Sequence, residues 1–223
     1  MIRYYLTVQL LSDATFGRGA GLAGSVDVEI EHDQQGCPFI GGRALKGLLV
    51  EEWANLRFAL GTDAWDEAAA WLFGTSGDAH AHMHVGAATL PPDLVAAIGR
   101  DPVAKRLTAQ QILAALTGIR RQTAIDAETG APERASLRAM RVLLRDTDLI
   151  APLDFDAAPP PEGQNYLLGL LAACALATRR GGTGRNRGRG KLQLRLHAAT
   201  PTDYRDSSFT TACFEPFARE ALA

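Results

Sequence analysis

Long hydrophobic runs are missing from this sequence, and cysteine is scarce. The longest nearly continuous apolar run extends from Tyr166 to Ala177, well short of the roughly 20 residues that cross a bilayer, so we expect no membrane span. The N-terminus alternates polar and apolar residues and lacks the apolar block of a secretory signal. The cysteines, Cys37, Cys174 and Cys213, are far apart and odd in number, which predicts reduced thiols and a cytoplasmic protein.

The sequence also lacks an excess of either charge. Its 223 residues include 23 basic and 25 acidic side chains, a balance that normally argues against a nucleic-acid partner. The basic residues are nevertheless unevenly distributed. Seven of them and no acidic residue lie between Arg179 and Arg195, and six arginines lie between Arg120 and Arg145. These two basic segments are candidate contacts for an anionic partner.

Hydrophobic periodicity predicts an α+β fold. Residues 2–10 alternate as a half-buried strand, and residues 44–60 repeat apolar side chains at helical spacing. Further strands are expected over residues 26–30, 80–90, 149–155 and 192–196, and further helices over residues 64–73 and 165–177. The core order is then β-α-β-β-α-β, the ferredoxin-like (RRM-like) arrangement that many RNA-binding modules share. Residues 93–146 are expected to form an inserted, projecting segment with a helical piece at 109–116 and a turn at 129–132.

The strongest local signal is the glycine–arginine loop, residues 181–190, which lies between the last predicted helix and the last predicted strand. Glycines let a backbone approach a ligand closely, and exposed N–H groups together with arginines favour a bound phosphate. The alternative is a flexible, solvated connection. The loop does not match the G-x-x-x-x-G-K-[ST] pattern of a nucleotide P-loop.

A second signal is the start of the helix expected near Gly42, where Arg43 and Lys46 lie in the first turns. Cations at a helix N-terminus oppose the helix dipole, whereas an external phosphate would favour both residues. The plain alternative is that Lys46 is simply solvated.

A third signal is acidic. Asp27, Glu29, Glu31 and Asp33 fall on one face of a predicted strand, and an exposed acidic face is the ordinary interpretation of such a pattern. Asp27 differs in that it directly follows a glycine-rich segment. A carboxylate in that position could reach a phosphodiester held by neighbouring cations.

Three histidines, His80, His82 and His84, also share one face of a predicted strand. Two-residue steps along a single strand rarely close a tetrahedral metal site without a fourth ligand from elsewhere. We therefore expect exposed or core-edge histidines without a metal.

Several segments, in order along the chain, resemble the backbone subunit of type III CRISPR effector complexes, in the repeat-associated mysterious protein (RAMP) superfamily. They are GSVD at residues 24–27 leading into 32–33, PFIGGRALKG at 38–47, LFG at 72–74, the arginine-bearing insertion at 119–148 and the glycine–arginine loop. Residues 13–19, with the sequence DATFGRG, look most like the III-D branch of that family.

The resemblance implies a palm with a projecting β-hairpin thumb, copies of which stack along a guide RNA. Each thumb would flip out a base at regular intervals, and an aspartate that maps to Asp27 would cleave the target RNA there. The implied division is residues 1–92 for the first half of the palm with the glycine loop and guide-binding helix, 93–148 for the thumb region and 149–223 for the second half of the palm.

The implied partners are guide RNA, target RNA, further copies of the chain or related backbone subunits, and other type III effector subunits, with no membrane. Mg²⁺ or another divalent cation is expected to support cleavage, and zinc is not expected. The residues expected to contact RNA, from the basic segments and the resemblance together, are Arg18, Arg43, Lys46, Arg120, Arg121, Gly181, Gly182, Gly184, Arg185, Arg187, Gly188 and Arg189.

Alternatives remain open at this point. Some members of the family lack the aspartate and only bind RNA, so a non-catalytic scaffold is the second hypothesis, and Asp13 and Asp33 are rivals to Asp27. A guide-processing ribonuclease of the same superfamily would use histidine chemistry, and no histidine lies in the first glycine loop. A small-molecule enzyme on this fold would purify free of RNA.

The chain departs from the family pattern at residues 42–44, where the family usually has small hydroxyl residues. Here Arg43 would replace the hydroxyl hydrogen-bond donors with a charged guanidinium group.

Overall fold

A four-stranded antiparallel sheet with helices packed against it forms the part of the molecule that we call the palm. The computed structural model describes residues 2–17, 19, 26–75, 80–100, 107–158 and 163–221. Across the sheet the strands follow the order β2 (Met83–Val85), β5 (Asp148–Phe155), β1 (Ile2–Leu10) and β6 (Leu192–His197). Each neighbouring pair is antiparallel.

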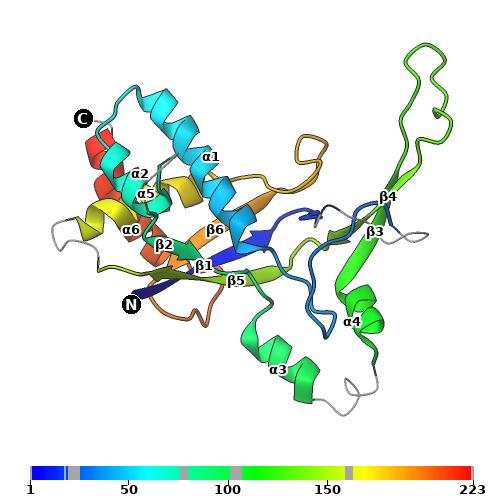
Figure 1. Ribbon diagram of the computed structural model, residues 1–223, viewed down its shortest axis with the longest axis horizontal. Helices are drawn as coiled ribbons and strands as arrows, with labels where there is room; N and C mark the ends of the chain where they lie inside the picture. Colours follow the sequence, from blue (N-terminus) through cyan, green and yellow to red (C-terminus); the bar gives the residue numbers. More distant parts are fainter. Residues whose placement is uncertain are drawn as a thin grey trace.

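The helical connections give the sheet its topology. Helices α1 (Gly42–Leu60) and α2 (Asp66–Phe73) lie between β1 and β2 in the chain, α5 (Gln164–Ala177) lies between β5 and β6, and α6 (Ser208–Ala221) follows (Figure 1). The order of the central elements is therefore β-α-β-β-α-β, and the predicted ferredoxin-like fold is confirmed. None of the helices in the described ranges is long and apolar enough to cross a membrane.

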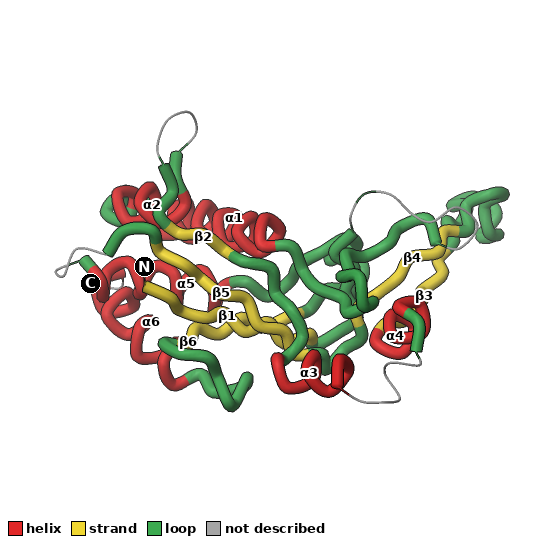
Figure 2. Tube along the Cα trace, turned by 60° about the horizontal axis from the view of Figure 1, so that its bottom comes forward, coloured by secondary structure: helices red, strands yellow, loops and turns green. Residues whose placement is uncertain are grey.

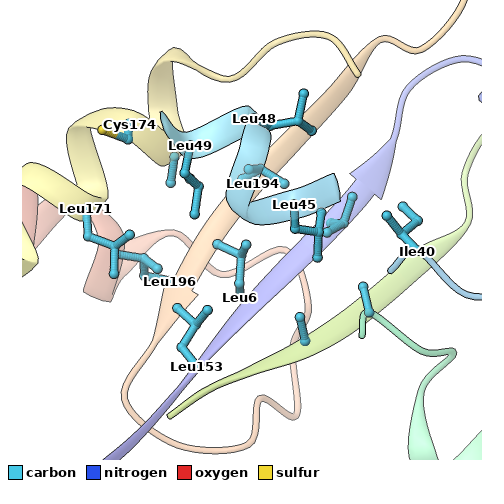
Figure 3. Close-up of a cluster of buried hydrophobic side chains, with 14 of the residues drawn as sticks. Leu6, Ile40, Leu45, Leu48, Leu49, Leu153, Leu171, Cys174, Leu194 and Leu196 are labelled. Atoms are coloured by element: carbon cyan, nitrogen blue, oxygen red, sulfur yellow. The ribbon is translucent and has the colours of Figure 1, made fainter. Parts of the chain in front are cut away.

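The core lies between the sheet and the helices α1 and α5. Alternation along β1 buries Leu6, which is opposite Ala151 of β5 and Leu196 of β6. Leu45 and Leu49 of α1 and Leu171 of α5 face the same cluster (Figure 3). Each fully buried leucine contributes about 1.5 to 3 kcal/mol relative to an exposed one, so this layer holds the palm together.

A two-stranded hairpin is inserted between β2 and β5. Its strands β3 (Thr117–Gln122) and β4 (Arg138–Leu143) pair from Thr117 opposite Leu143 to Gln122 opposite Arg138. Helices α3 (Pro92–Arg100) and α4 (Ala109–Leu116) precede it in the chain. Figures 1 and 2 both show the hairpin and α4 at the opposite end of the molecule from α5 and α6. The inserted hairpin projects from the palm, as predicted.

The segment that follows the first glycine-rich stretch differs from the prediction. Residues 26–30 make isolated bridges rather than a named strand, with Val28 running parallel to Met140 of β4. The expected exposed acidic face is wrong for Glu29, whose side chain is fully buried against Arg141. Glu29 can be buried because it pairs with Arg141, which is 112 residues away in the sequence. The local alternation of polar and apolar residues cannot reveal such a distant partner.

Candidate nucleic-acid interface

A groove of about 630 Å³ lies between the glycine–arginine loop and the palm end of the hairpin. We call it the arginine groove. Four arginines and a single aspartate line it, with few other polar groups; the lining residues are Leu11, Ser12, Asp13, Arg120, Arg121, Leu144, Arg145, Gly188 and Arg189. Guanidinium groups present planar, permanently charged forks that match phosphate oxygens. The groove is therefore suited to an anionic backbone.

The glycine–arginine loop is fixed to the palm by its own backbone. The N–H of Gly181 donates to Gly190 O (2.9 Å), that of Thr183 donates to Thr15 O (2.7 Å), and that of Gly190 donates to Asp13 O (2.9 Å). Gly190 has a φ of +70°, and a Cβ there would lie 2.0 Å from Gly181 O. The loop is thus an ordered turn packed on residues 13–15, and glycine is required where its two ends cross.

The arginines of this loop have different roles. Arg185 forms a two-pronged ion pair with Glu51 of α1, at 2.7 and 2.6 Å, and this guanidinium lowers the pKa of the Glu51 carboxyl. Arg189 reaches the hairpin, where it donates to Gln122 Oε1 at 2.6 Å. Arg187 is exposed and makes no side-chain hydrogen bond to any described residue. Arg187 is therefore accessible to a ligand, Arg189 connects the loop to the hairpin while lining the groove, and Arg185 serves mainly to hold the loop on α1.

Asp13 joins the two walls of the arginine groove. Its Oδ2 accepts from Arg120, with the NH2 nitrogen at 2.6 Å and Nε at 2.8 Å, and its Oδ1 accepts from the backbone N–H of Arg145 at 3.0 Å. Asp13 was a rival candidate for the catalytic aspartate. These contacts give it a structural role, and they orient the Arg120 side chain in the groove.

Arg121 differs from the other arginines of the groove, whose side chains form hydrogen bonds within the described chain. It is exposed and pairs through its backbone with Ala139 of β4. Its side chain makes no hydrogen bond to another residue of the described chain. The guanidinium is therefore available to an external anion.

The start of α1 lies outside the arginine groove. Arg43 is exposed and Lys46 is half-buried, and burial lowers the pKa of Lys46. The cap residue Gly41 has no side-chain cap, and a Cβ there would lie 2.6 Å from Glu31 Oε2. A carboxylate thus already lies at this helix end, so the sequence-based argument for an external phosphate is weaker here than in the groove.

Asp27 is exposed and lies beside β4 of the hairpin. Its Oδ2 accepts from the Ala139 N–H at 2.6 Å, and its own N–H donates to Ala139 O at 2.8 Å. Asp33, the other rival, instead accepts at Oδ1 from the N–H groups of Gln35 and Cys37, both at 2.8 Å. Asp33 stabilises a turn, while Asp27 keeps its Oδ1 free of hydrogen bonds to the described residues.

The structure thus brings together only part of the predicted site. Arg120, Arg121, Gly188 and Arg189 line one groove, whereas Arg43, Lys46 and Gly181–Arg187 do not, and Arg18 lies outside the described residues. Arg145 also lines the groove but is not among the site residues predicted from the sequence. It lies at the end of the second basic segment, and that position was the signal that could have identified it.

Comparisons with known proteins agree with the fold. The model of the RAMP superfamily matches residues 7–193, and no curated protein sequence matches the chain significantly. A chain of the type III-B Cmr-beta bound to cognate target RNA, solved by cryo-electron microscopy, is 10% identical with a TM-score of 0.63, over 88% of this chain and 97% of that one. A chain of the type III-B Cmr-beta in its apo state is 12% identical with a TM-score of 0.59, over 87% and 97%.

Proposed function

The chain belongs to the RAMP superfamily, and from that premise we propose that it is a backbone subunit of a type III CRISPR effector complex. In this role it holds a guide RNA and cleaves the complementary target RNA with Asp27. Its partners are the guide, the target, further copies of itself or related backbone subunits, and the other subunits of the complex.

The observation that carries the proposal is the arginine groove. Its four arginines come from two segments that are distant in the sequence and meet between the palm and the hairpin. Contacts from guanidinium groups to phosphates carry no sequence information. A scaffold for arbitrary guides needs this kind of contact, because base pairing with the guide supplies the specificity.

The location of Asp27 supports the catalytic part of the proposal. It is exposed, and its Oδ2 is held by the Ala139 N–H of the hairpin, the element that would distort the target strand. A flipped-out nucleotide can align its 2′-OH with the adjacent phosphate. Asp27 Oδ1 then accepts the 2′-OH proton as O2′ bonds to phosphorus. The P–O5′ bond breaks, and the 5′ oxygen takes a proton from water, which leaves a 2′,3′-cyclic phosphate and a 5′-OH.

Mg²⁺ would be held at this position by Asp27 alone among the described residues near β4. Such ions are commonly held by substrate phosphates together with one or two carboxylates, and because Asp27 Oδ1 takes the 2′-OH proton, the phosphate oxygens of the RNA would supply most of the ligands. When bound, the ion would offset the charge of the phosphate. The residues of the chain supply the orientation of the reacting groups.

A non-catalytic scaffold is the second candidate, and one observation favours it. The hydrogen bonds between Asp27 and Ala139 attach the hairpin to residues 26–30, so Asp27 has a structural use that requires no chemistry. The two candidates make different predictions for a substitution that keeps this contact.

The cleavage test uses the complex assembled with a defined guide and an end-labelled complementary RNA, with and without Mg²⁺. Asp27→Asn retains an oxygen that can accept from Ala139 but loses the base, and we expect regularly spaced cuts in the native complex to fall by a factor of about 10² or more. Asp33→Asn, at the rival carboxylate, should keep the cuts. Guide retention with no cutting by the native complex would establish the scaffold.

The binding test uses the full chain with a labelled single-stranded RNA of mixed sequence. Arg121→Ala should weaken binding similarly for all sequences and reduce the slope of log Kd against log salt by about 0.7 for one lost phosphate contact. Arg219→Ala removes an exposed arginine of α6 that is outside the groove, and it should leave the slope unchanged. Equal slopes for both variants and the native chain would contradict the groove assignment.

A further inference from the structure

Three histidines gather around one carboxylate at the edge of the sheet. Asp156 Oδ2 lies 2.6 Å from His80 Nε2 and 3.3 Å from His84 Nε2, while Asp156 Oδ1 lies 2.7 Å from His82 Nδ1. The ligand atoms of His80, His84 and Asp156 all lie within 4.8 Å of one another. The cluster is separate from the arginine groove, whose lining includes none of these residues.

The backbone on both sides of this cluster is fixed. His84 is opposite Asp154 in the pairing of β2 with β5, and the Asp156 N–H donates to His82 O at 3.1 Å. The His82 N–H donates to Trp71 O at 2.9 Å, and the His82 ring packs against the Trp71 ring in a tilted arrangement, with centroids 4.9 Å apart. The carboxylate and the imidazoles are therefore brought together by the sheet itself.

We propose that His80, His84 and Asp156 bind a zinc ion, with His82 holding the second carboxylate oxygen. Two atoms each about 2.05 Å from a tetrahedral ion are about 3.3 Å apart. His84 Nε2 already lies 3.3 Å from Asp156 Oδ2, whereas His80 Nε2, at 2.6 Å, has to move away from it. The side chains of His80 and His84 are 68% and 56% exposed, so both rings have room for the small adjustment. Water completes the coordination on the solvent side.

The donor set favours zinc over Mg²⁺. Imidazole nitrogen suits Zn²⁺, whereas Mg²⁺ prefers an all-oxygen octahedron. His82 would hydrogen-bond the second carboxylate oxygen of Asp156 and so orient this metal ligand. Metal-ligating carboxylates are commonly held by such a hydrogen bond. A metal was not expected from the sequence, because a single strand rarely closes such a site without a further ligand from elsewhere. Asp156, at the end of β5 and 72 residues beyond His84, supplies that ligand.

The bound ion would stabilise the pairing of the edge strand β2 with β5. β2 has only three residues and is an edge strand of the described sheet that pairs with β5 alone, so few ladder hydrogen bonds hold it in place. A metal bridging His80 and His84 with Asp156 links the start of β2 to the end of β5. Zinc should therefore raise the midpoint temperature of unfolding.

The test uses the purified full chain, freed of metal with a chelator and titrated with ZnCl₂ by calorimetry, with Co²⁺ as a spectroscopic probe. We expect one zinc per chain, a Co²⁺ absorption spectrum typical of tetrahedral coordination, and a zinc-dependent rise in the midpoint temperature. His80→Gln and His84→Gln should weaken zinc binding more than tenfold, and His82→Ala by about tenfold.

His32→Gln is the matched control, since His32 lies in another turn, where its Nδ1 is 3.0 Å from Asp33 O, and it should leave zinc affinity unchanged. Because His80 is largely exposed, His80→Gln should unfold at the native midpoint temperature in the absence of zinc, which shows that the variant is folded. The proposal is overturned if zinc fails to saturate at one site, or if His80→Gln and His84→Gln bind it as tightly as the native chain.

Discussion

The Asp27 carboxylate accepts a hydrogen bond from the backbone N–H of Ala139, with 2.6 Å between Oδ2 and N. The Asp27 N–H donates back to the Ala139 carbonyl, and the Arg141 N–H donates to Val28 O at 3.0 Å. Residues 27–28 therefore run parallel to β4 and are joined to it by backbone hydrogen bonds and one isolated bridge. Any movement of the hairpin on bound RNA would carry the candidate catalytic carboxylate with it.

This contact predicts different stabilities for two substitutions of Asp27. Asp27→Asn keeps an acceptor for Ala139, so its free energy of unfolding should stay within about 0.5 kcal/mol of the native value. Asp27→Ala removes the acceptor and should cost about 0.5 to 1.5 kcal/mol. Urea denaturation followed by circular dichroism measures both. Equal stabilities of the two variants would show that the contact contributes nothing to the fold.

A buried ion pair anchors the base of the hairpin. Glu29 Oε1 accepts from Arg141 Nε at 2.8 Å, and Arg141 also donates to Thr117 Oγ1 at 3.1 Å. Glu29→Ala leaves a guanidinium whose side chain is only 12% exposed without its carboxylate, and we take the low end of the cost of breaking a buried pair, about 3 kcal/mol. We expect a loss of that size in urea denaturation.

The matched control for Glu29→Ala is a surface ion pair. Arg57 pairs with Asp66, and both side chains are exposed. Arg57→Ala should cost no more than about 1 kcal/mol. If the two variants lose similar stability, the hairpin is not anchored by Glu29.

The fold was predictable from sequence because its main elements have regular local patterns. The alternation of β1 and the helical period of α1 predicted those elements closely, and residues 109–116 are a helix as expected. Helix α6 was missed, and Pro216 inside it argues against a helix on local grounds. The available signal was Asp206, whose carboxylate accepts from the Ser208 N–H at 2.9 Å at the start of the helix.

The candidate site was only partly predictable because its contacts join distant segments. The two basic segments were visible in the sequence, and the groove between them draws on both. Local spacing could not show that Arg185 is occupied by Glu51, 134 residues earlier, or that Arg120 is oriented by Asp13. Such pairings depend on the tertiary fold.

The two ends of the glycine–arginine loop meet where Gly190 lies against Gly181, and this contact predicts unequal effects of two glycine substitutions. Gly184 has a φ of +77° with open space around its Cα, whereas Gly190 has a φ of +70° and faces Gly181 O. Gly184→Ala should lose about 1 to 2 kcal/mol from the left-handed backbone alone. Gly190→Ala adds a backbone clash and should cost more, together with a loss of RNA affinity. Thermal unfolding and RNA titration check the pair, and an equal loss would contradict the crossing.

His197 predicts a loss of stability in mild acid. Its side chain is buried, with Nε2 3.1 Å from Thr7 Oγ1, and the Thr7 hydroxyl donates to Tyr204 O at 3.1 Å. Because the Thr7 hydroxyl hydrogen is donated to Tyr204 O, the Thr7 oxygen acts as the acceptor towards His197. The neutral His197 ring then donates its Nε2–H to Thr7 Oγ1. Burial lowers the pKa of His197 below the ordinary value near 6.5, with Asp206 opposing this shift and Arg195 adding to it.

The sign of the pH effect follows from that lowered pKa. Below about pH 6.5 the unfolded chain takes up a proton at His197 that the folded chain resists, so the free energy of unfolding falls until the pH reaches the folded pKa. We expect the midpoint temperature of the native chain to drop between pH 7.5 and 5.5 by more than that of His197→Gln, whose amide still donates to Thr7. His32→Gln should follow the native curve, because His32 lies in an unrelated turn. Parallel curves for the native chain and His197→Gln would mean that the buried ring does not contribute to acid sensitivity.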